Sequence, residues 1–547
     1  MWDGSRLAPT PEMFSGRSGG ARWAARAAVA AAVALTAGCS SSGDDSAAGD
    51  ENDLTSLTAR QRILSFDGVV YVAPGTSDDD VLAAARKQTQ TAFGALLASK
   101  VAVRTREVQN VEIKSIKKRD VVVVDTNLAA DAGKPMIEVS YKYKDEAVIP
   151  VELSRHSSLS LALLAQGADY EWKTIVPDCT ANDKEMRDDA ENGLLWYDFN
   201  PTKASCRHAI DREQRTIDAD TDKLTNKSKM ISKSRATRLF LPTAMRLERA
   251  ATATNATYPE YDKLFGGGIN PNVLTIALVN GRLAHEHVEA SKDDGYYEWM
   301  DTLGTIFTKH PEFQLTKIEP QETLDSAMVA GHKIGGLKFQ DFIQWTVYGT
   351  GYPAGLSAAD KKELTTKIAA KLDNHWVTFE KKVKVQLGDG PAKDFTLRIE
   401  TLFGADENPE PHRHAVKRGD VVVYNGHSYI GYGPLDPDNF SASSFPSTYQ
   451  LLFFDSCVSY NYYETDFFTL NPGGSKVLDM ITNGIEAPEY RSGEMQGNLI
   501  SRLMDGSLPS YQTLLGSASE TDSLRVVDGE LDNTYHPTRV KLRVTAP

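Results

Sequence analysis

The chain has 547 residues, of which 41% are hydrophobic and 24% are charged, and its formal net charge is −14. This composition is typical of a folded globular protein. The acidic excess argues against a nucleic-acid-binding protein, because DNA and RNA select a basic surface. The roughly 500 residues that follow the leader are enough for two or three domains, and they contain no apolar run of the length that spans a bilayer.

The first 38 residues have the pattern of an export signal. Three arginines at positions 17, 22 and 26 precede the apolar run 27–35. That run is too short to cross about 30 Å of hydrocarbon, but it has the length of a signal-peptide core. It ends in Leu35-Thr36-Ala37-Gly38-Cys39, which resembles the lipobox of bacterial lipoproteins, with Thr36 where leucine is commoner.

This resemblance implies cleavage before Cys39 and attachment of lipid to that residue. It places the protein in the bacterial cell envelope, lipid-anchored and extracytoplasmic, on the outer membrane or the cell surface. The alternative is an ordinary secretory signal with a chance cysteine.

Three segments are expected after the signal peptide. Residues 39–57, rich in Ser, Asp and Gly, are interpreted as a flexible tether. Residues 58–255 mix short β-branched runs with helical stretches, which predicts an N-terminal α+β domain. Residues 256–547 predict an α/β domain with a helical insertion around 323–372.

The N-terminal elements are expected, in chain order, as a strand at 69–72, a helix at 79–99, strands at 121–125 and 136–143, and a helix within 203–233. The C-terminal half continues with a strand at 273–279, a helix at 296–307, a hairpin formed by 383–386 and 395–401 around the turn 388–390, strands at 420–424, 449–454 and 476–482, and a helix at 492–504. Continuous apolar strands between helices predict a mainly parallel sheet that is flanked by helices. In such sheets, ligands bind beyond the carboxyl ends of the strands.

Cysteine spacing identifies one residue of special interest. The chain has four cysteines: Cys39, Cys179, Cys206 and Cys457. With Cys39 assigned to lipid, an oxidising exterior favours pairing of Cys179 with Cys206. By the chain-entropy model, closing a loop of this length stabilises the fold by about 3 kcal/mol. Cys457 then lies outside this pair, which makes it a candidate for chemistry.

Two motifs follow neighbouring apolar strands at the point where each strand ends. The strand 420–424 leads into Asn425-Gly426-His427-Ser428, and the strand 449–454 leads into Asp455-Ser456-Cys457. If the strands are parallel neighbours, His427 and Cys457 emerge at the same edge, about 5 Å apart per strand spacing. A thiol beside an imidazole and backbone amides is what acyl transfer by a nucleophilic thiol requires.

The two motifs resemble those of clan CD cysteine peptidases, which include caspases, gingipains, clostripain and legumains. The resemblance covers roughly residues 395–510. It implies a caspase-like fold, a peptide or protein substrate, and no metal or cofactor. It implies Cys457 as the nucleophile and His427 as the residue that protonates the leaving amine.

The same resemblance implies supporting roles for four neighbours. The N–H groups of Cys457 and Ser428 would face the oxyanion, Gly426 precedes the histidine, and Asp455 and Ser456 precede the nucleophile. The family usually has glycine directly after the histidine, where this chain has Ser428.

These observations predict a membrane-anchored cysteine endopeptidase without a nucleic-acid partner. The main alternative is a catalytically inactive caspase-like lipoprotein that acts as a binding or assembly module. A third hypothesis is a metal-dependent hydrolase in which His285 and His287, with Glu289, bind zinc; the competing interpretation of these residues is a solvated turn.

Three further features have plainer interpretations. His412 and His414 are expected on a Pro-rich loop as surface histidines, although they would also be in reach of the cleft. The aromatic residues between 460 and 468 are either core packing or one wall of a substrate groove. The glycines at 266–268 lack the Lys-Ser/Thr of a phosphate loop and predict a hinge.

Overall fold

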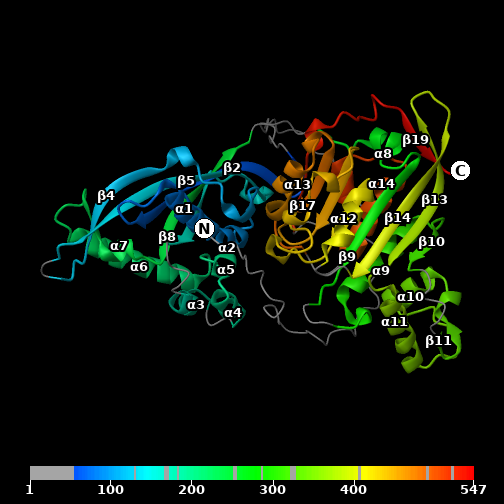
Figure 1. The fold of residues 1–547 in the computed structure, drawn as a ribbon, viewed down its shortest axis with the longest axis horizontal. Coiled ribbons are helices and arrows are strands. Elements are labelled where there is room, and N and C mark those ends of the chain that lie inside the picture. Colours follow the sequence, from blue (N-terminus) through cyan, green and yellow to red (C-terminus); the bar gives the residue numbers. More distant parts are fainter. Residues whose placement is uncertain are drawn as a thin grey trace, which may run out of the picture.

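The computed structural model describes residues 54–128, 131–165, 172–180, 184–250, 255–284, 288–320, 328–404, 408–487, 492–518 and 523–547. The predicted lipidation site Cys39 and the histidine pair His285 and His287 lie outside these ranges. Within them, ten strands form one large sheet and seven form a second. Helices cover the sheets, and the protein belongs to the α/β class (Figure 1).

Five parallel strands form the centre of the large sheet. In chain order they are β9 (Val273–Gly281), β14 (Lys393–Gly404), β15 (Val421–Asn425), β16 (Gln450–Asp455) and β17 (Leu478–Asn483). Their spatial order is β14-β9-β15-β16-β17. The chain therefore builds β14 on one side of β9 and then crosses back to build β15, β16 and β17 on the other side, so the switch point lies between β9 and β15. A ligand site is expected beyond the carboxyl ends of the strands at such a switch point.

Antiparallel strands complete both sides of this sheet. They are β18 (Arg525–Asp528) beside β17, β13 (Trp376–Leu387) beside β14, and, farther out, β1 (Thr55–Ser56), β10 (Gln314–Glu319) and β19 (Leu542–Thr545). The β13–β14 hairpin turns through Gly388, whose φ of 65° suits a residue without a side chain.

Alternate residues of the central strands enter two different cores. In β15, Val421 and Val423 pack with one layer of helices, whereas Val422 and Tyr424 pack on the other face. The first layer contains α8 (Tyr261–Gly267), α9 (Asp294–Lys309), α10 (Phe339–Tyr348), α11 (Ala358–Leu372), α14 (Ser492–Met504) and α15 (Tyr511–Ala518). The second contains α12 (Pro409–Arg418) and α13 (Thr465–Leu470). This two-sided burial explains why the strands are apolar throughout.

The second sheet belongs to the N-terminal half. Its strands are β2 (Ala59–Val72), β3 (Ala102–Val103), β4 (Lys117–Val124), β5 (Lys134–Pro150), β6 (Ser158–Leu164), β7 (Met230–Ser232) and β8 (Phe240–Arg249). Its helices are α1 (Asp78–Gln90), α2 (Ala92–Ala98), α3 (Trp172–Thr180), α4 (Lys184–Glu191), α5 (Leu195–Asp198), α6 (Ala204–Asp222) and α7 (Lys233–Ala236). A disulfide between Cys179 and Cys206 ties α3 to α6.

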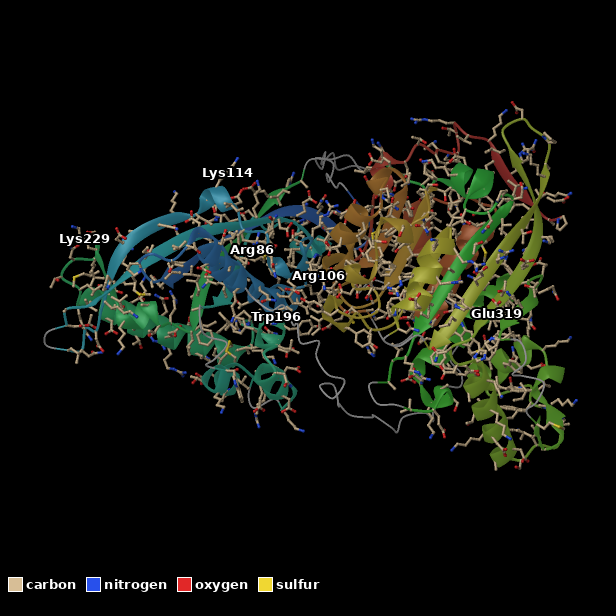
Figure 2. All side chains as sticks on the ribbon, viewed as in Figure 1. Arg86, Arg106, Lys114, Trp196, Lys229 and Glu319 are labelled. Carbon is tan, nitrogen blue, oxygen red and sulfur yellow. A yellow bond between two sulfur atoms is a disulfide. The ribbon has the colours of Figure 1, made fainter. Side chains whose placement is uncertain are left out.

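The two halves are joined by a continuous core. Phe93 and Tyr143 of the N-terminal half belong to the same buried cluster as Tyr462 and Tyr463 of the C-terminal half. Figure 2 places Arg106 and Trp196 at this junction. No helix within the described ranges combines the length and the hydropathy needed to cross a bilayer.

Candidate functional site

The structure brings His427 and Cys457 to the same edge of the large sheet. Strands β15 and β16 are parallel neighbours, and their register pairs Asn425 with Asp455. His427 and Cys457 each follow two residues after this paired position. Because neighbouring strands lie about 4.8 Å apart, the two residues follow the carboxyl ends of adjacent strands at the same edge of the sheet.

The ring of His427 is oriented by a backbone carbonyl from the next strand. Its Nε2 lies 3.0 Å from the carbonyl oxygen of Leu283, which follows β9. A carbonyl can only accept, so Nε2 carries the hydrogen and Nδ1 is the basic nitrogen of the neutral ring. The Tyr424 hydroxyl donates to the His427 carbonyl at 2.8 Å, which fixes the backbone as well.

This local geometry explains Gly426. A Cβ at that position would lie 2.5 Å from the Tyr424 hydroxyl oxygen, closer than real contacts allow. The Tyr424 side chain folds back across Gly426 to reach His427, so glycine is needed for the bond to form. Ser428 is buried, and its carbonyl accepts a hydrogen bond of 2.8 Å from the Tyr463 hydroxyl.

Cys457 is half-buried among phenol rings. It is the cysteine of the described ranges that lies outside the disulfide, and it packs on the core formed with Tyr462 and Tyr463. Burial raises the pKa of Tyr197, and the neighbouring Cys457 thiol adds to the shift. Tyr197 is part of α5, so the N-terminal half also reaches the thiol.

The backbone is strained directly after both motifs. Val458 has a φ of 52°, and Tyr429 and Ile430 have φ values of 50° and 52°. Residues other than glycine rarely adopt the left-handed backbone conformation, and a β-branched residue such as valine adopts it least of all. Each such residue costs about 1–3 kcal/mol and persists only where the surroundings impose it, which happens most often at functional sites.

A buried polar network holds the loop that carries Cys457. Asp455 Oδ1 accepts hydrogen bonds of 2.8 Å from both Asn483 Nδ2 and Arg525 Nη2, and its Oδ2 accepts one of 3.0 Å from Gln496. The side chains of Asp455 and Arg525 are 0% and 3% exposed. Asp455 therefore holds the loop in place, and both of its carboxylate oxygens are occupied by these donors. Ser456, between Asp455 and Cys457, is also buried, and its hydroxyl has no hydrogen-bond partner within the described ranges.

The N-terminal half fixes the loop after His427, which the sequence did not indicate. Arg106 donates to the carbonyl of Gly431 at 2.8 Å and to Asp436 at 3.3 Å. Its guanidinium also lies 4.6 Å from the centre of the Tyr432 ring. The neighbouring Glu107 accepts a hydrogen bond from the Tyr432 hydroxyl.

The N-terminal half equally fixes the π-helical turn Tyr460–Glu464 that follows Cys457. Arg104 donates to both carboxylate oxygens of Glu464 at 2.9 Å. Asn461 Nδ2 donates to the carbonyls of Val103, in β3, and of Thr105. Phe93 stacks on Tyr462 with ring centres 5.9 Å apart. Both loops of the candidate site therefore rest on the N-terminal half.

The expectation for His412 and His414 was wrong. Both lie on α12, which begins at Pro409 after the capping residue Asn408, and not on a loop. His412 is buried, which lowers its pKa to about 4, and it packs on the ring of Tyr424. His414 packs on Trp376.

The other candidates are now placed as well. In the aromatic segment, Tyr460, Tyr462, Tyr463 and Phe467 are buried, so core packing is the correct interpretation. The glycines at 266–268 lie at the end of α8. Within the described ranges no three His, Cys, Asp or Glu side chains are arranged to hold a metal ion. Glu289 pairs with Lys292 at 3.0 Å.

Comparisons with protein-family models, with curated proteins and with solved structures found no match to this chain. The geometry of the site is therefore the basis for a functional hypothesis.

Proposed function

We propose that the protein is a cysteine endopeptidase with a caspase-like fold of clan CD, anchored by lipid at Cys39 to the extracytoplasmic side of the bacterial envelope. The observation that carries the proposal is the register of β15 and β16. It sets His427 and Cys457 two residues beyond a paired position, at the carboxyl edge of a parallel sheet. The Leu283 carbonyl supplies the third group that orients the base in such a site.

The proposed reaction follows from these positions. Nδ1 of His427 takes the proton of the Cys457 thiol, and the thiolate forms a C–S bond with the substrate carbonyl carbon. The backbone N–H groups of Cys457 and Ser428 stabilise the oxyanion, a role worth about 3 kcal/mol for each donor in comparable sites. The imidazolium then returns its proton to the leaving amine as the C–N bond breaks, and water hydrolyses the thioester.

One observation favours a second candidate function. The N-terminal half packs against the loops after both His427 and Cys457, through Arg106 and Arg104 respectively. A site whose loops are held by another part of the chain suits a binding or assembly module on a caspase-like fold. Ser428, in the place of the usual glycine, is consistent with that alternative.

Thiol reactivity separates the two functions. We would label the lipid-free body, residues 40–547, with iodoacetamide between pH 5 and 9 and locate the label by mass spectrometry. An activated nucleophile reacts at Cys457 at least tenfold faster at pH 7 than a simple thiol does, and His427→Ala removes this advantage. His332→Ala is the matched control and leaves the rate unchanged, because β12 (His332–Lys333) lies outside both large sheets.

Cleavage of denatured protein substrates is the second step of the same test. Loss of the acid–base group in His427→Ala lowers the rate by about 10²–10⁴-fold, and Cys457→Ala abolishes cleavage. Equal labelling of the parent protein and His427→Ala, together with no cleavage, would exclude the peptidase and favour the binding module.

A further inference from the structure

Basic side chains gather on the exposed face of the N-terminal sheet. Along β5, Tyr141 and Tyr143 are buried in the cores beneath α1 and α2, whereas the alternate residues Lys142 and Lys144 are exposed. Successive side chains of a strand point to opposite faces. The two lysines therefore share the face that lies away from these helices.

The segment that leads into β4 adds two lysines and an exposed apolar side chain. Lys117 is exposed and pairs with Ser140, which precedes Lys142 by two residues, so it lies on the same face. The 3₁₀ turn Ile113–Ser115 comes just before it, and the Ser115 hydroxyl accepts a hydrogen bond of 2.7 Å from the Lys142 N–H. The Ile113 side chain in this turn is 62% exposed, and Lys114 lies at the outer edge of the N-terminal half (Figure 2). These residues form the basic patch: Ile113, Lys114, Lys117, Lys142 and Lys144.

The positive charge of the basic patch is not compensated within the described ranges, where none of its four lysines has an ion-pair partner. The carboxylates on the same face pair instead with arginines, each at 2.6 Å: Asp67 with Arg246, Glu138 with Arg119 and Glu146 with Arg104. Glu112 is an exposed carboxylate beside the turn, and the lysines outnumber it. This local excess contrasts with the formal net charge of −14 for the whole chain.

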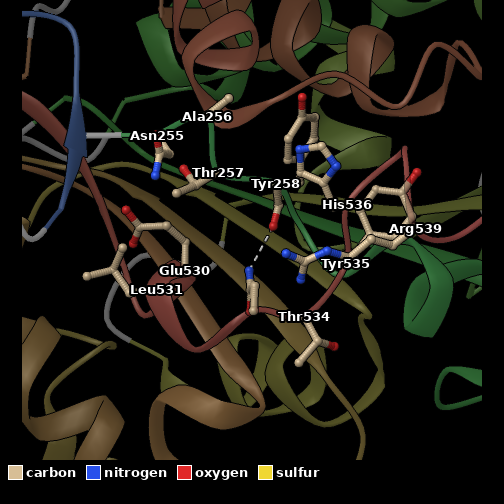
Figure 3. Close-up of a pocket in the computed structure, with 11 residues that line it drawn as sticks. Asn255, Ala256, Thr257, Tyr258, Glu530, Leu531, Thr534, Tyr535, His536 and Arg539 are labelled. Atoms are coloured by element: carbon tan, nitrogen blue, oxygen red, sulfur yellow. Dashed lines mark hydrogen bonds between the residues drawn. The ribbon is translucent and has the colours of Figure 1, made fainter. Parts of the chain in front are cut away.

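The basic patch lies within reach of the proposed lipid anchor. In β1, the Thr55 hydroxyl shares a hydrogen bond of 2.7 Å with the hydroxyl of Thr257, which lines the hollow shown in Figure 3. Strand β2 begins at Ala59 and reaches Ser65, the partner of Lys144, about 20 Å farther along. The fourteen residues 40–53 span at most about 50 Å. A body anchored at Cys39 can therefore lay the basic patch on the bilayer that holds the lipid.

We propose that the basic patch docks the N-terminal half on an anionic phospholipid surface, with its lysines at the headgroup phosphates and Ile113 inserted between the lipids. The proposal rests on the lipid anchor of the proposed function and not on its catalytic chemistry. An anionic membrane attracts nearby lysines, and a basic patch adds a second attachment to a lipid chain. The exposed isoleucine favours a bilayer over a soluble polyanion, because only the bilayer offers an apolar region in which to bury it.

Co-sedimentation of residues 40–547 with vesicles tests the proposal, because this protein carries no lipid and need not be catalytically active. The vesicles contain phosphatidylglycerol and phosphatidylcholine in equal parts, or phosphatidylcholine alone, at about 50 mM salt. Binding should be at least tenfold stronger to the anionic vesicles and should fall at least fivefold at about 0.5 M salt, since salt screens the attraction. Lipidation is read separately, from the mass of the mature N-terminal peptide, so that failure of the anchor and failure of the docking are distinguishable.

Variants assign the contacts. The double variant Lys142→Gln with Lys144→Gln should lower binding to anionic vesicles at least tenfold, because each lysine near such a surface contributes about fivefold. Lys362→Gln with Lys393→Gln, two exposed lysines of the C-terminal half, is the control with the same change of charge.

The apolar contact is tested in the same assay. Ile113→Ser should lower binding at least threefold, whereas its control Leu315→Ser, at a side chain of β10 that is 42% exposed, should not. Equal binding to the two kinds of vesicle, or equal binding of the two double variants, would overturn the proposal. Binding that depends on the lysines but not on Ile113 would also overturn it, and would point to a soluble polyanion as the partner.

Discussion

The ion pair beneath the Cys457 loop allows a quantitative test of how the site is held. Arg525→Met removes the guanidinium that donates to Asp455 at 2.8 Å and keeps an apolar stem of similar length. Both side chains are almost fully buried. The substitution therefore leaves a carboxylate inside the protein with only the amides of Asn483 and Gln496 as donors.

Removing one partner of a buried pair costs about 3–5 kcal/mol, because the other charge stays desolvated. The two remaining hydrogen bonds to Asp455 place Arg525→Met at the lower end of this range. The guanidinium also lies 4.9 Å from the centre of the Phe453 ring, and losing that contact adds about 1 kcal/mol. We expect a total of about 4 kcal/mol.

Urea unfolding of residues 40–547 measures this loss, with the exposed Arg543→Met as the matched control. Asp455→Asn alone should cost about 3 kcal/mol, because it strands the buried guanidinium. The double variant should cost at least about 1.5 kcal/mol less than the sum of the two, since neither charge is then left alone. A loss below about 1 kcal/mol for Arg525→Met, or additivity within about 0.5 kcal/mol, would refute this account of the network.

Three further outcomes are expected from urea unfolding. Burial raises the pKa of Asp479 to about 7. The free energy of unfolding that the protonated Asp479 contributes is therefore fully present below about pH 4 and is lost as the pH rises through 7. Asp479→Asn should remove that slope, about 1.4 kcal/mol per pH unit between pH 5 and 7, and an unchanged slope would contradict this. Reducing Cys179–Cys206 should cost about 3 kcal/mol through the closed loop, and Cys179→Ser should make the protein insensitive to reductant. Arg104→Ala should cost about 1–3 kcal/mol, because it removes the guanidinium that donates to both oxygens of the buried Glu464; a cost below about 0.5 kcal/mol would contradict this.

The strands of the C-terminal half were predictable because burial on both faces makes them uniformly apolar. The prediction of a strand at 273–279 is confirmed by β9, and those at 420–424 and 449–454 by β15 and β16. The hairpin around Gly388 is confirmed by the antiparallel pairing of β13 and β14. In each case the signal is local: an apolar run bounded by turn residues.

The helix that contains His412 was missed although its signals were present. Asn408 is a favourable N-cap, and its side chain accepts from the Glu410 N–H. Pro409 then occupies the first helical position, where proline is common. Two prolines at 409 and 411 suggested a loop, but proline in the first turn removes only N–H groups that have no partner inside the helix.

The contacts that orient the candidate residues were beyond prediction for a different reason. His427 is held by a carbonyl 144 residues earlier in the chain, and the segment after Cys457 is held by Arg104, 360 residues from Glu464. No periodicity or motif encodes such a pairing, because each partner looks locally like any other loop residue. The residues that would carry chemistry are visible in the sequence, whereas the groups that set their geometry come from tertiary packing. Strained backbone at Val458 is tolerable only because that packing is extensive, and so the N-terminal half is better regarded as part of the site's framework than as a spacer.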